Sequence, residues 1–124
     1  MRVIVVEPAK EPVVREIDSG LTSMQSIVGG YIEAIYPFND PVAVVVNEEG
    51  KLEGLPWNRV LVDGDKPVDV LVGTLFICGL GDDGFDSLSD DLVEKYMKKF
   101  SIDGLCMLTN KGFIPCVSMN EEEV

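Results

Sequence analysis

The 124-residue chain carries 22 Asp and Glu residues against 10 Lys and Arg, has no histidine, and is 46% hydrophobic. A net charge of -12 repels nucleic acids and anionic membranes and attracts basic partners, so we expect no direct nucleic-acid binding. The sequence lacks the imidazole that titrates nearest neutral pH and shows no recognisable catalytic constellation. We therefore expect a binding protein and not an enzyme.

Length and hydropathy predict a single domain over residues 1–118, followed by a frayed acidic tail over 119–124. No apolar run approaches the ~18 residues that a membrane span needs, so we expect no membrane segment and a cytoplasmic location. The cysteines Cys78, Cys106 and Cys116 lack metal-ligand spacing, and we expect neither a metal nor another cofactor. The redox state of Cys106 and Cys116 stays open at this level.

The first half of the chain predicts a hairpin and then a helix. Residues 3–6 and 12–17 are β-branched runs on either side of a loop, which is typical of paired strands. Apolar residues then recur at near-helical spacing after Ser19, and Gly29-Gly30 provides a left-handed end to a short helix.

A continuous apolar run at 42–46 is typical of a strand buried on both faces, and we expect it to be central. Turn residues at 47–50 follow it and predict that Lys51 and Leu52 return antiparallel to this strand. Residues 54–59 are expected to form an irregular connection or a single helical turn.

In the second half, residues 68–78 predict one long strand with Gly73 as a possible bulge. A helix with an apolar stripe follows, capped by Ser87 or Ser89 and ending near Lys99, and a hairpin is expected over 104–118. These elements predict an α+β fold: a small antiparallel or mixed sheet with two helices packed mainly on one face, plus the C-terminal hairpin.

Residues 79–84 read Gly-Leu-Gly-Asp-Asp-Gly, which is a literal dinucleotide-binding pattern. Asp82 and Asp83 would occupy the place where a pyrophosphate approaches the backbone, so a plain strand-to-helix loop is favoured. The acidic residues between 82 and 91 could attract a hard cation, but a solvated acidic helix cap is the stronger interpretation.

Three segments of the chain, residues 21–33, 46–58 and 72–74, resemble a domain-of-unknown-function family carried by phages, plasmids and other bacterial mobile elements. The resemblance covers about residues 1–100 and implies a mobile-element accessory protein with no transferable activity. It also makes the polar members of these segments candidates for a shared surface or pocket: Gln25, Glu33, Asn47, Lys51 and Asn58. Each has a structural alternative, such as making a turn or bonding nearby backbone.

The favoured function is non-catalytic binding that masks a basic surface of a host defence or DNA-binding protein. The candidate binding residues are Gln25, Glu33, Asn47, Glu48, Glu49, Lys51, Asn58, Asp82 and Asp83. One alternative is a pocket for a nucleotide signal or another metabolite, with phosphate sites formed by Arg2, Lys51, Arg59 and Lys66. Another is a structural or assembly subunit, in which the apolar strands of the terminal hairpin form a homodimer edge.

Overall fold

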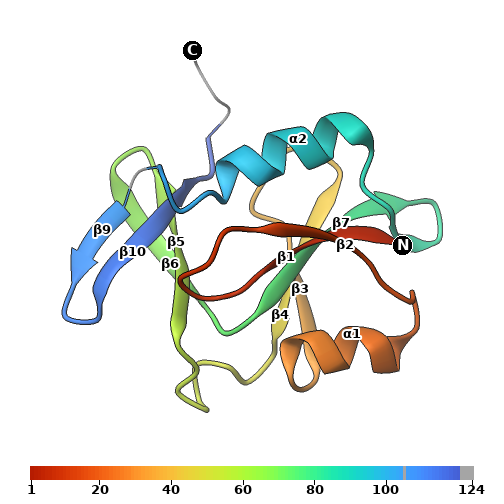
Figure 1. Cartoon of the computed structure of the whole chain (residues 1–124), viewed down its shortest axis with the longest axis horizontal. Helices are drawn as coiled ribbons and strands as arrows, with labels where there is room; N and C mark the ends of the chain where they lie inside the picture. The colour runs from red at the N-terminus through yellow and green to blue at the C-terminus, as the bar shows by residue number, and fades with distance from the viewer. Residues whose placement is uncertain (105, 121–124) are drawn as a thin grey trace.

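The protein is described by a computed structural model that covers residues 1–104 and 106–120 (Figure 1). It is mostly β, with 45% strand and 15% helix, and its strands form two sheets. The predicted α+β fold with one small sheet is therefore wrong. The prediction underestimated the strand content because it expected residues 54–59 to be irregular and residues 79–84 to be a loop, whereas β5 starts at Trp57 and residues 79–86 continue β7 and form β8.

The first sheet has six strands in the order β2-β1-β7-β4-β3, with β8 paired to the end of β7, and its neighbours are all antiparallel. Its strands are β1 (Arg2–Val6), β2 (Val13–Glu16), β3 (Ile32–Ile35), β4 (Val42–Asn47), β7 (Leu75–Gly81) and β8 (Gly84–Asp86). The predicted N-terminal hairpin is confirmed as β1 and β2. The apolar run at 42–46 is confirmed as an inner strand, although β7 lies at the centre of the order.

The second sheet has four strands in the order β6-β5-β10-β9. Its strands are β5 (Trp57–Asp63), β6 (Lys66–Val72), β9 (Cys106–Thr109) and β10 (Gly112–Ser118). Strand β10 runs parallel to β5 and antiparallel to β9, so this sheet is mixed. The predicted terminal hairpin is confirmed as β9 and β10.

Both helices form where the spacing of apolar residues predicts them. Helix α1 (Leu21–Val28) ends at Gly29, whose φ of 80° is left-handed and whose N–H donates to the Gln25 carbonyl. Helix α2 (Asp90–Lys99) starts at Ser89, whose hydroxyl accepts a hydrogen bond from the Leu92 N–H.

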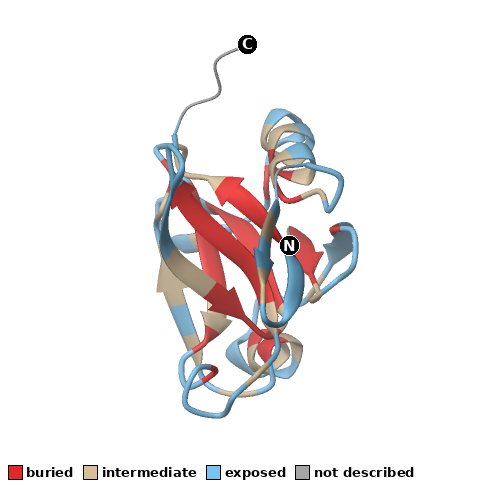
Figure 2. Cartoon of the chain, turned by 90° about the vertical axis from the view of Figure 1, so that its left-hand side faces the viewer, coloured by how far each residue is buried: buried red, intermediate tan, exposed pale blue. Residues whose placement is uncertain are grey.

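The two helices cover opposite faces of the first sheet, so the prediction that they share a face is wrong (Figure 1). Side chains alternate along a strand, and β1 sends Ile4 and Val6 toward Tyr96 of α2 but Val3 and Val5 toward Met24 of α1. The core under α2 also contains residues of the second sheet, and buried residues concentrate along the strands (Figure 2).

The chain passes from one sheet to the other at Gly73, within the stretch that predicts a single strand. Gly73 has a φ of 73°, and a Cβ there would lie 2.7 Å from Leu55 Cδ1. This left-handed residue turns the chain between β6 and β7. The long strand over 68–78 is therefore two strands in two sheets.

Strand β5 begins in the segment expected to be irregular. Trp57 is half-buried, Asn58 and Arg59 are buried, and all three belong to the strand. Residues 48–54 form turns in place of the predicted antiparallel return, and Lys51 and Leu52 lie in that loop. The loop carries the chain from the first sheet to the second.

The Gly-x-Gly-x-x-Gly segment is a β-hairpin between β7 and β8, with Asp82 and Asp83 exposed in its turn. Gly79 is needed for close approach, because a Cβ there would lie 2.6 Å from the Ser87 carbonyl oxygen. Neither a nucleotide-binding turn nor the favoured strand-to-helix loop is present at residues 79–84.

Of the tail expected over 119–124, Met119 donates its N–H to the Val62 carbonyl, and the Asn120 side chain bonds Asp63 and the Gly64 N–H. Residues 121–124 lie outside the described residues.

Candidate binding pocket

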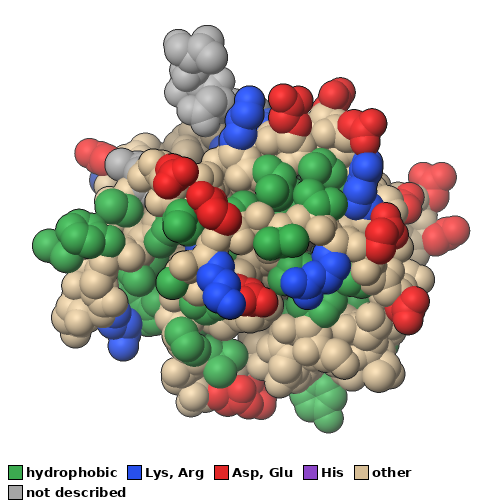
Figure 3. All heavy atoms as spheres, in the orientation of Figure 1, with side chains coloured by type: hydrophobic (Ala, Val, Ile, Leu, Met, Phe, Trp, Pro, Cys, Tyr) green, Lys and Arg blue, Asp and Glu red, His purple; other side chains and the backbone are tan. Residues whose placement is uncertain are grey.

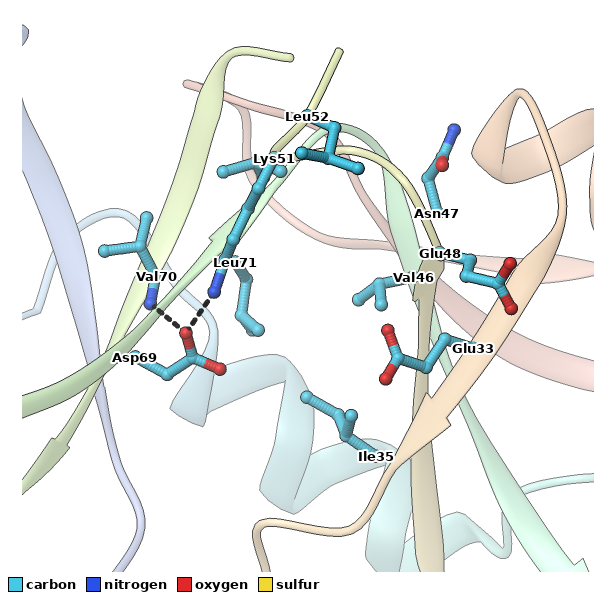
Figure 4. A pocket seen from close by; sticks show the side chains of 11 residues that line it. Glu33, Ile35, Val46, Asn47, Glu48, Lys51, Leu52, Asp69, Val70 and Leu71 are labelled. Carbon is cyan, nitrogen blue, oxygen red and sulfur yellow. Dashed lines mark hydrogen bonds and ion pairs between the residues drawn. The ribbon is translucent and has the colours of Figure 1, made fainter. Parts of the chain in front are cut away.

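A pocket of about 190 Å³ lies where the two sheets meet beside the 48–54 loop (Figure 4). Strands β3 and β4 of the first sheet, strand β6 of the second sheet and the loop itself provide its walls. The lining residues are Glu33, Ile35, Val46, Asn47, Glu48, Lys51, Leu52, Asp69, Val70, Leu71 and Val72. The pocket therefore depends on the crossing of the chain between sheets.

The lining combines aliphatic side chains with an excess of negative charge. Ile35, Val46 and Leu71 provide apolar surface, and the charged lining side chains are three carboxylates and one ammonium group. The Lys51 Nζ donates a hydrogen bond to Asp69 Oδ1, which also accepts from the Val70 N–H at 2.8 Å. Glu33 projects into the pocket from β3, and the Glu48 carboxylate points away from the Lys51–Asp69 pair (Figure 4).

Two of these carboxylates have no Lys or Arg of the described residues within ion-pair distance. Within residues 1–104 and 106–120, neither Glu33 nor Glu48 takes part in a side-chain ion pair or hydrogen bond. The pocket thus keeps uncompensated negative charge next to apolar surface, which suits a ligand that is both cationic and aliphatic.

Four of the nine candidate residues from the sequence, Glu33, Asn47, Glu48 and Lys51, line this pocket. Gln25, Glu49 and again Asn47 line a neighbouring shallow hollow beside the end of α1. Asp82 and Asp83 lie apart from both hollows, in the β7–β8 turn.

Asn47 has a structural task that explains its burial. Its Nδ2 donates to the Val28 carbonyl at 3.2 Å, and its Oδ1 accepts from the Glu49 N–H at 2.8 Å. The side chain therefore joins the end of α1 to the turn after β4, and its polar atoms are already used at the pocket wall.

Asn58 is 1% exposed and lies outside the pocket. Its Nδ2 donates to the carbonyls of Val6 and Gly73 at 2.9 and 2.7 Å, and its Oδ1 accepts from the Arg59 guanidinium. Asn58 therefore connects the β6–β7 connection at Gly73 to the end of β1.

Arg59 is fully buried, and sequence reasoning did not anticipate this role. Its guanidinium donates to the carbonyls of Phe100, Lys10 and Asn58 as well as to the Asn58 side chain. Burial lowers the pKa of Arg59 to about 10, and nearby Glu11 opposes that shift. A buried polar cluster at the start of a strand gives no periodic signal, which is why this segment was expected to be irregular.

The cations that a phosphate site would need do not converge. Arg2 donates to the Leu88 carbonyl and pairs with Asp90 at 2.8 Å. Arg59 is buried, and its guanidinium already donates to carbonyl groups. Lys51 is paired with Asp69, and Lys66 lies exposed at the start of β6.

The cysteines are free thiols. Burial raises the pKa of Cys78 to about 12 and also raises the pKa of Cys116, which keeps both in the unreactive thiol form. Cys106 is exposed at the edge of the second sheet.

Neither a metal-binding group of side chains nor a membrane-spanning helix is found in the described part of the chain. No group of three or more Cys, Asp or Glu side chains there is arranged to hold a metal ion. The same residues include no helix that is long and apolar enough to cross a membrane.

Comparison with known proteins gives a family but no characterised relative. No curated protein matches the chain, and no solved structure does. A family model described as a domain of unknown function, DUF3846, matches residues 1–101, which include both helices and every strand except β9 and β10. The chain belongs to the DUF3846 family of domains of unknown function.

Proposed function

We propose that this protein acts in the cytoplasm by non-catalytic binding to a basic surface of another protein. The observation that carries the proposal is the pocket between the sheets, which holds uncompensated carboxylates beside apolar side chains. Such a lining attracts Lys or Arg side chains and disfavours the phosphates of nucleotides and nucleic acids. The net charge of -12 adds long-range attraction to the same class of partner.

The class of partner follows from the mobile-element context that the sequence resemblance implies. Nucleic-acid-binding proteins and host defence enzymes carry basic surfaces, and an acidic protein that covers such a surface competes with nucleic acid for it. On the face shown in Figure 3 the carboxylates do not gather into one patch: several lie along its upper and right-hand outline, and others lie further in. The general charge therefore speeds the encounter, and the pocket provides a local contact.

The test uses the immobilised chain to capture proteins from a lysate of the bacterial host at about 50 mM and 500 mM salt. We expect basic proteins that are released at the higher salt and whose nucleic-acid binding the purified chain inhibits. Replacement of Glu48, Glu49, Asp82 and Asp83 by lysine should abolish this inhibition. The proposal would be contradicted if the captured proteins were not basic. It would also be contradicted if the inhibition of nucleic-acid binding changed neither with salt concentration nor on charge reversal.

A second candidate function, assembly into a homodimer, is favoured by one feature of the terminal hairpin. Leu108 and Phe113 face each other across β9 and β10 and are 69% and 70% exposed. Strand β9 forms the edge of its sheet, where a second copy of the same edge could pair with it. Size-exclusion chromatography with light scattering distinguishes monomer from dimer, and Leu108→Lys should abolish any dimer formed through this edge.

A further inference from the structure

The pocket between the sheets already holds one cationic side chain of the protein itself. The Lys51 ammonium group reaches Asp69 at the pocket wall, and the alkyl chain of Lys51 belongs to the lining. The site therefore accommodates a lysine head group in the protein's own fold. Glu33 lies on the opposite wall with no cation of its own among the described residues (Figure 4).

The size of the pocket restricts what else can enter it. A volume of about 190 Å³ is more than ten times the ~15 Å³ that a single water molecule requires. It is less than the ~300–1,000 Å³ of pockets that enclose small-molecule ligands and cofactors. A single long side chain fits this volume, with its methylene groups against Ile35, Val46 and Leu71.

From this geometry we propose that the pocket receives one lysine or arginine side chain of the basic partner, with its charged end between Glu33 and Asp69, and that Lys51 occupies the cation position in the free protein. This inference rests on the proposed function and adds the point of contact. Lys51 then competes with the partner's side chain for Asp69. Removal of Lys51 should therefore strengthen binding by more than removal of a lysine elsewhere on the surface, which general charge attraction does not predict.

The probe is N-acetyl-lysine methylamide, titrated into the ¹⁵N-labelled chain and followed by NMR. We expect amide shift changes concentrated at Ile35, Val46 and Leu71. The norleucine analogue, which has the alkyl chain but no charge, should cause much weaker changes. Changes spread over all acidic turns, or none in the pocket, would overturn the inference.

Two variants of pocket residues, each with a matched control on α2, distinguish binding in the pocket from attraction by the overall charge. Glu33→Gln should weaken probe binding about tenfold, whereas Glu94→Gln, which removes the same charge from an exposed site on α2, should leave it within about twofold. Lys51→Met should tighten binding by more than Lys98→Met, because only the former frees Asp69. Equal effects within either pair would overturn the inference.

A hexalysine peptide separates failure of this inference from failure of the proposed function. If hexalysine binds in a salt-dependent way but the pocket signals do not move, the partner-masking function stands and the pocket assignment is wrong. If neither probe binds and the lysate yields no basic protein, both are wrong.

Discussion

At the scale of single residues, the Arg59 side chain is tightly held, because its buried guanidinium connects three segments that are distant in sequence. It donates to carbonyls of the N-terminal loop, of β5 itself and of the residue that ends α2. Such a charge tolerates burial only because its donors are satisfied by oxygen acceptors.

Replacement of Arg59 by methionine should therefore lower the free energy of unfolding by about 3 kcal/mol, because the buried Phe100 carbonyl and the partly buried Lys10 carbonyl lose their donor. Chemical denaturation measures this loss. Arg15→Met on the exposed strand β2 is the matched control and should change stability by less than about 0.5 kcal/mol. Equal losses in the two variants would show that the buried network contributes nothing specific.

Asp40 gives a prediction about pH. Its carboxylate accepts hydrogen bonds from Lys95 and Tyr96, both at 2.7 Å, and these contacts lower the pKa of Asp40 below its usual 3.8. A carboxyl group with a lowered folded-state pKa stabilises the fold above the unfolded-state pKa, and this contribution is lost as pH falls through the folded-state pKa.

Asp40→Asn should thus cost about 1–2 kcal/mol of unfolding free energy at pH 7. The cost should shrink toward zero as the pH is lowered below 3.8, because the wild-type carboxyl then also becomes neutral. Urea denaturation at a series of pH values measures the difference, with Asp65→Asn in the exposed β5–β6 turn as the charge-matched control. A cost that is constant with pH would refute the assigned ion pair.

At the scale of elements, the helices and the two terminal hairpins are predictable because their signals are local. Ser89 caps α2, Gly29 ends α1, and β-branched runs flank short loops. The division of residues 66–81 between two sheets was not predictable, because a strand shows the same side-chain alternation in either sheet. For the same reason Asp69, an acidic residue between valines of a predicted strand, gave no sign that it would face Glu33.

Gly73 is where that division can be tested. Gly73→Ala should destabilise the protein by about 2 kcal/mol or more, since an L-residue there combines an unfavourable positive φ with a contact of 2.7 Å to Leu55. Gly104→Ala is the control, because a Cβ at that position meets nothing within 4 Å. Thermal unfolding of the two variants gives the comparison. Equal stability would mean that the chain can cross between the sheets without a left-handed residue.

At the scale of the whole molecule, the net charge of -12 opposes the compact state through self-repulsion. The melting temperature should therefore rise by about 3 °C when salt is raised from ~10 mM to ~150 mM, as the screening length falls from ~30 Å to ~8 Å. Asp82→Asn combined with Asp83→Asn reduces the charge by two units in an exposed turn and should show a smaller rise. A melting temperature that does not respond to salt would show that the carboxylates are too far apart to repel each other effectively.

The parallel pairing of β5 with β10 has a consequence for biosynthesis. Residues 116–118 of β10 lie beside residues 60–62 of β5, so segments more than fifty positions apart must meet before that ladder exists. A nascent polypeptide elongated only as far as α2 presents an unpaired β5 border to the crowded interior of the cell. Strand β10 can pair with β5 only after residues 112–118 have left the ribosome, so this pairing forms later than the contacts within residues 1–99.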